Sequence, residues 1–105
     1  LTACEVEIPK TMAGLNLRDT AALKKRNRVF GFDGNHDIYD WQNTTSNLET
    51  RYIVEGDWKF LDHVEGEDEL YNITADPWEK KNLAGAKPKK VAALGKALDA
   101  WWKPE

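Results

Sequence analysis

The strongest constraint on the fold is a pair of apolar runs separated by a Gly-Asp dipeptide. Arg51 to Val54 and Trp58 to Leu61 flank this dipeptide in the stretch RYIVEGDWKFL. β-Branched and aromatic residues suit a pleated, half-buried strand, and Gly56 can adopt the positive φ that a two-residue turn requires. The stretch therefore predicts an antiparallel hairpin with strands at about 50–55 and 58–63.

Alternation along these strands leaves apolar side chains on both faces of the hairpin. One face carries Ile53, Trp58 and Phe60, and the other carries Tyr52, Val54 and Leu61. Both faces need cover, and a single helix can cover only one of them. We expect the second face to be covered by the N-terminal third of the chain or by a missing partner. Without that partner the chain is expected to self-associate.

Two further apolar runs predict the outer strands of a four-stranded antiparallel sheet, at about 27–32 and 69–73. Near the C-terminus, apolar residues recur at helical spacing over about 88–102, namely Val91, Leu94, Leu98, Trp101 and Trp102. The predicted fold class is α+β, with this amphipathic helix packed on one face of the sheet. Leu94, Leu98 and Trp101 are expected to be buried against the sheet.

Two shorter helices are also expected. Asp19 or Thr20 can cap one of them over residues 19–26. The other is predicted from Asp76-Pro77-Trp78-Glu79, because aspartate can cap, proline suits the first helical position and glutamate can close a capping box. This second helix would be short, because Asn82 and Gly85 end it.

Composition and length limit the classes of function. A chain of 105 residues with a net charge of −3 forms at most one domain. It has no clustered basic face for nucleic acid and no apolar run long enough to span a bilayer. Cys4 is the only cysteine, which excludes an internal disulfide and a CxxC site. We expect Cys4 to be a small buried residue.

The polar stretch 33–48 predicts a long loop with at most a short helical turn, and loops of this length are often functional. It contains His36, Asp37, Tyr39 and Trp41. The aromatic residues are suited to stacking on a sugar or aryl ring, or equally to packing the loop onto the sheet.

Three motifs together resemble the C-terminal subdomain of the sulfatase family, a group of sulfuric-ester hydrolases. They are R-Y-x-x-x-G-D-W-K, E-L-Y-N and D-P-x-E-x-x-N-L-A. The opening stretch LTACEVEIPKTMAGLNL is similar to the segment that leaves the catalytic domain of these enzymes. The resemblance implies that residues 1–26 lead out of a missing catalytic domain and that residues 27–105 form the C-terminal subdomain.

The resemblance also implies what the parent protein supplies. Its N-terminal catalytic domain would be the partner of this chain, its substrate a sulfate ester, and its compartment the periplasm or the exterior of the cell. Catalysis would need a formylglycine made from the Cys or Ser of C/S-x-P-x-R and a divalent cation, usually calcium. The stretches around Cys4 and Ser46 do not match that motif, and the family's paired aspartates are absent. We therefore expect no catalytic residue, no metal site and no turnover in this chain alone.

Four residues are candidates for substrate contact under this resemblance: His36, Asp37, Trp41 and Arg51. The first three lie in the loop that can reach toward the cleft, of which the subdomain would form one wall. Arg51 either faces the cleft or pairs with Asp62 across the hairpin, and we favour the structural role.

Two other classes of function remain open. The first is an independent carbohydrate-binding module using His36, Tyr39 and Trp41. The second is the C-terminal part of a related phosphodiesterase or phosphonate monoester hydrolase.

Overall fold

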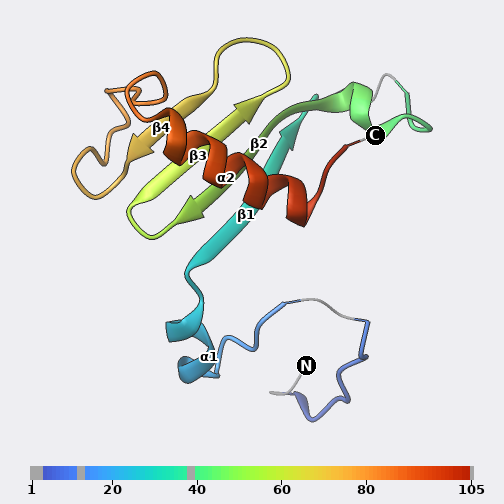
Figure 1. The fold of residues 1–105 in the computed structure, drawn as a ribbon. Coiled ribbons are helices and arrows are strands. Elements are labelled where there is room, and N and C mark those ends of the chain that lie inside the picture. Colours follow the sequence, from blue (N-terminus) through green and yellow to red (C-terminus); the bar gives the residue numbers. More distant parts are fainter. Residues whose placement is uncertain (1–3, 12–13, 38–39, 105) are drawn as a thin grey trace.

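A four-stranded antiparallel sheet with one long helix on one face forms the body of the molecule (Figure 1). The computed structural model describes residues 4–11, 14–37 and 40–104. Its elements are α1 (Thr20–Lys25), β1 (Arg28–Gly34), the 3-10 turn η2 (Thr44–Asn47), β2 (Leu48–Glu55), β3 (Trp58–His63), β4 (Glu69–Asn72) and α2 (Pro88–Trp101). The strands lie in sequence order across the sheet. The α+β fold class is thus confirmed.

The predicted hairpin is the centre of the sheet. Strands β2 and β3 pair with Ile53 opposite Phe60, and the turn places Gly56 at a φ of +55°. Positive φ costs glycine little because it has no Cβ, whereas other residues would be strained there. Strand β1 runs two residues beyond its predicted end, because Gly34 pairs with Leu48 after a register shift.

The core lies between this sheet and α2. Five side chains are at most 2% exposed: Ile53, Phe60, Leu70, Leu94 and Leu98. The predicted burial of Leu94 and Leu98 is therefore confirmed. The predicted burial of Trp101 is wrong, since it is 42% exposed. It stacks on Phe30 of the edge strand β1 at a centroid distance of 5.2 Å, which covers only part of its ring.

The second predicted helix, over residues 76–82, is also wrong, because this segment consists of turns and irregular chain. Glu79 has a φ of +52° and both of its carboxylate oxygens accept from Lys59 Nζ at 2.8 Å. Asn82 Oδ1 accepts from the backbone N–H of Leu70 at 3.1 Å. These contacts with β3 and β4 hold the segment against the sheet in a non-helical path.

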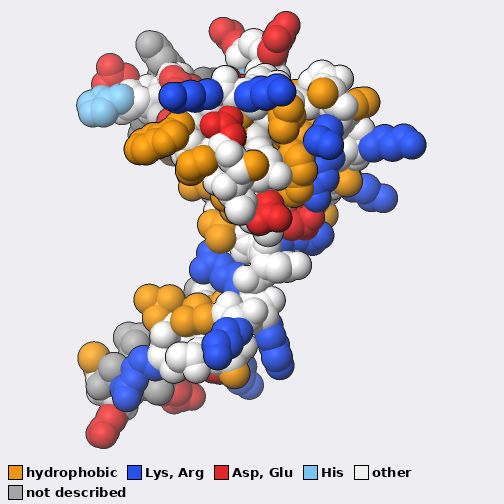
Figure 2. All heavy atoms as spheres, turned by 90° about the vertical axis from the view of Figure 1, so that its left-hand side faces the viewer, with side chains coloured by type: hydrophobic (Ala, Val, Ile, Leu, Met, Phe, Trp, Pro, Cys, Tyr) orange, Lys and Arg blue, Asp and Glu red, His pale blue; other side chains and the backbone are white. Residues whose placement is uncertain are grey.

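The N-terminal third does not cover the second face of the sheet. Residues 4–11 and 14–20 are exposed throughout, and no residue of α1 is buried. This part stands apart from the sheet (Figure 1) and joins the body of the molecule through a narrow neck in Figure 2. Cys4 is exposed, which corrects its predicted burial: the segment around it has no element to pack on. Helix α1 itself begins as predicted, with Asp19 Oδ1 accepting from Ala22 N at 2.9 Å.

Candidate functional site

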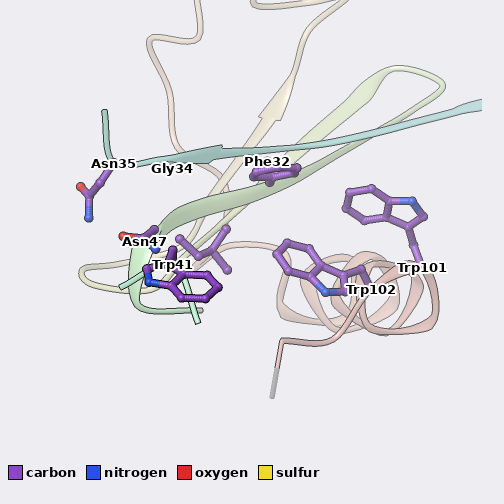
Figure 3. A pocket seen from close by; sticks show the side chains of 8 residues that line it. Phe32, Gly34, Asn35, Trp41, Asn47, Trp101 and Trp102 are labelled. Carbon is purple, nitrogen blue, oxygen red and sulfur yellow. The ribbon is translucent and has the colours of Figure 1, made fainter. Parts of the chain in front are cut away.

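An aromatic pocket of about 650 Å³ lies where the end of β1, the start of β2 and the end of α2 meet. We define it by its described lining residues: Phe32, Gly34, Asn35, Trp41, Asn47, Leu48, Trp101 and Trp102. In the view of Figure 3, the indoles of Trp41 and Trp102 lie on opposite sides of the pocket, with Phe32 on the strand above.

The loop side of the pocket is held by close backbone contacts. Asn35 N donates to the carbonyl of Asn47 at 2.8 Å, which joins the end of β1 to η2. A side chain at Gly34 would meet that same carbonyl at 2.8 Å, so glycine permits the approach. Asn47 Nδ2 donates to the carbonyl of Asp40 at 3.0 Å, which fixes the chain next to Trp41.

The helix side of the pocket is held by Arg51, whose side chain is only 11% exposed. Its Nη1 donates to the carbonyl of Trp102 at 2.5 Å, its Nε to Asp62 Oδ2 at 2.9 Å and its Nη2 to Asp99 Oδ1 at 3.0 Å. Burial lowers the pKa of Arg51, but the hydrogen bonds to Asp62 and Asp99 outweigh it and raise that pKa above its usual value. The guanidinium therefore stays charged and links α2 to the central hairpin. We call this set of bonds the Arg51 clamp.

The rings around the pocket touch one another mainly edge to face, a favourable arrangement for aromatic pairs. Phe32 and Trp102 have centroids 5.5 Å apart, and Trp101 and Trp102 are 6.1 Å apart. Even so, Phe32 is 61% exposed and Trp41 is 79% exposed. The site thus presents large apolar rings to whatever enters it.

The structure places the four predicted substrate contacts in different surroundings. Trp41 lines the pocket. Arg51 lies behind it, and the expected pairing with Asp62 is present. His36 and Asp37 are almost fully exposed and are not among the residues lining the pocket; their side chains approach each other at 3.4 Å between Nδ1 and Oδ1. Tyr39 lies outside the described residues.

Sequence reasoning missed three of the rings in the pocket. The sequence predicts Phe32 only as part of a strand, and Trp101 and Trp102 only as part of the apolar face of a helix. The available signal was weak: one aromatic residue at the end of an edge strand and a Trp pair at a helix terminus.

Outside the aromatic pocket, a cluster of polar side chains joins β2, β3 and β4. Thr50 Oγ1 lies 2.8 Å from His63 Nδ1, and His63 Nε2 lies 3.6 Å from Glu69 Oε2. Because these residues are cross-strand neighbours on the second face, their contacts are accounted for by sheet pairing.

The described ranges contain no group of three or more His, Cys, Asp or Glu side chains that could hold a metal ion. Within the same ranges no helix is both long and apolar enough for a membrane span.

Comparison with known proteins points to one class of enzyme. No family model matches the chain. Arylsulfatase K of Xenopus laevis is 24% identical over 99 residues, a match that takes in 89% of this chain and 18% of that protein. The chain is therefore similar to part of a sulfatase and spans less than a fifth of its relative's length.

Proposed function

We propose that residues 27–105 form the C-terminal subdomain of a sulfatase and that residues 1–26 lead out of its catalytic domain. The observation that carries the proposal is the match to an arylsulfatase. This match covers 89% of this chain but only 18% of the relative. The rest of such an enzyme would hold the catalytic centre. The α+β fold and the partly exposed second face are consistent with a part that packs against a larger body.

In this role the chain completes the fold and forms one wall of the substrate cleft. His36 and Asp37 remain proposed substrate contacts, and their exposure leaves them accessible to a sulfate ester bound by the parent. Trp41 would meet an apolar part of the substrate. Arg51 would contribute through the position of Trp102, because its donors already bind that residue's carbonyl and two carboxylates.

The parent would supply the calcium ion and the formylglycine. The described residues of this chain do not offer a metal cluster, so no catalytic step is assigned to them. Incubating the purified chain with calcium and 4-nitrocatechol sulfate should give no turnover. Metal-dependent turnover that copurifies with the chain would contradict the proposal.

The coding sequence upstream separates sulfatases from related hydrolases. We expect it to contain C/S-x-P-x-R and a pair of aspartates. A Thr or Ser nucleophile without that context would instead indicate a phosphodiesterase or phosphonate monoester hydrolase. In the longer protein, deleting residues 27–105 should abolish sulfatase activity, whereas retained activity would remove the proposed role in the cleft.

A carbohydrate-binding module is the second candidate, because Trp41 lies in an aromatic pocket of the kind on which rings stack. Such a module would bind its sugar without a partner domain and would cover both faces of its sheet. The second face is partly exposed at Tyr52, Val54 and Leu61, which favours the sulfatase proposal. A glycan array probed with the isolated chain tests this alternative.

A further inference from the structure

We infer that the aromatic pocket binds an uncharged small molecule carrying a fused aromatic ring. The inference does not rest on the proposed function, because it concerns a pocket lined by residues of this chain and is tested on the chain alone.

The size and lining of the pocket define the ligand class. A volume of about 650 Å³ falls within the roughly 300–1,000 Å³ of small-molecule sites. The described residues that line it include no charged side chain, and four of the eight are Phe or Trp. An anionic group placed here would lose its hydration without meeting a cationic side chain among the described lining residues. The pocket is therefore suited to an uncharged ring system.

The pocket is also formed in advance of binding. Arg51 holds the Trp102 carbonyl on one side, and the Asn47 amide holds the Asp40 carbonyl on the other. A ligand would not have to order these segments, which reduces the entropic cost of binding. It would instead cover rings that are now exposed, including Phe32 at 61% and Trp41 at 79%.

An aromatic ring fits this lining better than a sugar does. The hydroxyl groups of a sugar each need a hydrogen-bond partner once they leave water. The described lining side chains with amide groups are Asn35 and Asn47, and the Asn47 amide already donates to Asp40 and Asn43 carbonyls. A flat apolar ring needs no such partners and gains from stacking against indole.

The chain offers a matched pair of variants for the test. Trp41 is 79% exposed and lines the pocket, whereas Trp78 is 80% exposed and does not. Binding of 2-naphthol is measured by equilibrium dialysis, and far-ultraviolet circular dichroism checks that each variant is folded. We expect saturable 1:1 binding to the unmodified chain. Trp41→Ala should raise the dissociation constant by roughly tenfold or more, while Trp78→Ala should change it by less than about twofold.

A further variant and a sugar probe distinguish specific binding of the aromatic ring from other kinds of binding. Trp41→Phe keeps a ring and should restore most of the affinity lost in Trp41→Ala. Absence of saturable binding to the unmodified chain, or equal losses in Trp41→Ala and Trp78→Ala, would overturn the inference. Binding of methyl β-galactoside as tight as that of 2-naphthol, with the same loss in Trp41→Ala, would also overturn it and would identify a sugar site.

Discussion

Arg51 shows how one residue can connect separate parts of a small fold. It lies on β2, pairs with Asp62 on β3, and reaches Asp99 and the Trp102 carbonyl at the end of α2. Together with the ring contacts of Trp101 and Trp102 to strand β1, these bonds hold the C-terminal end of α2 against the sheet. The position of Trp102 in the aromatic pocket depends on these contacts.

Arg51→Met tests the clamp, because methionine keeps an apolar stem while removing the donors. We expect the free energy of unfolding to fall by about 1.5–3 kcal/mol, as for hydrogen bonds to charged groups. Arg28→Met is the control: Arg28 pairs with Glu55 but its side chain is 50% exposed, so its loss should cost at most about 1 kcal/mol. Equal urea midpoints for the two variants would show that the clamp adds nothing beyond a surface ion pair.

Glu55 gives the fold a dependence on pH. A hydrogen bond from Arg28 lowers the pKa of Glu55 from 4.5, against a smaller opposing effect of burial and with help from Lys90. Because the folded-state pKa is the lower one, this stabilisation is present above pH 4.5 and is lost as pH falls through the folded pKa. The free energy of unfolding of Glu55→Gln, measured in urea, should therefore fall less on acidification than that of the unmodified chain. Parallel curves for the two would contradict this.

At the scale of elements, α2 stabilises the sheet through a narrow stripe of leucines. Leu98 is fully buried against the hairpin, whereas Lys96 on the same helix is exposed. Leu98→Ala should lower the free energy of unfolding by about 2–5 kcal/mol through lost burial and the cavity left behind. Lys96→Ala should change it by no more than about 0.5 kcal/mol. If the urea midpoint of Leu98→Ala matched that of Lys96→Ala, the stripe would not be the core.

Elements set by local pattern could be predicted from the sequence, and those set by distant contacts could not. The hairpin follows from Gly56 and alternating residues, and α2 from its apolar spacing. The segment 76–82 has the local chemistry of a helix start, yet Glu79 accepts from Lys59 and Asn82 accepts from the Leu70 backbone, and these contacts override it. The aromatic pocket unites residues from three separate segments, and its assembly depends on the register shift at Gly34.

At the scale of the whole molecule, the second face of the sheet remains partly uncovered. Tyr52 lies over Gly31, where a Cβ would come within 2.3 Å of the Tyr52 ring, and it shields part of this face. Val54 and Leu61 stay partly exposed, and Val29 is 39% exposed. Helix α2 covers the opposite face, and α1 stands away from both (Figure 1). The proposed parent enzyme would supply the missing cover through an inter-domain contact, typically about 600–1,500 Å².

Without that cover, we expect the isolated chain to form a two-fold dimer through the second face, because burying the same patch on two copies removes apolar surface from water. Light scattering over a wide concentration range should show the monomer converting to dimer. Val54→Glu should shift this equilibrium toward monomer, because it places a charge on the second face, where Val54 lies opposite Lys59. Lys59 already pairs with Glu79, so far-ultraviolet circular dichroism checks that the variant keeps its fold. Leu17→Glu is the control, because Leu17 is 75% exposed on the N-terminal part.

A strict monomer at every concentration would contradict the prediction. A dimer dissociated by Trp41→Glu but not by Val54→Glu would place the contact at the aromatic pocket instead, because only the first substitution puts a charge among those rings.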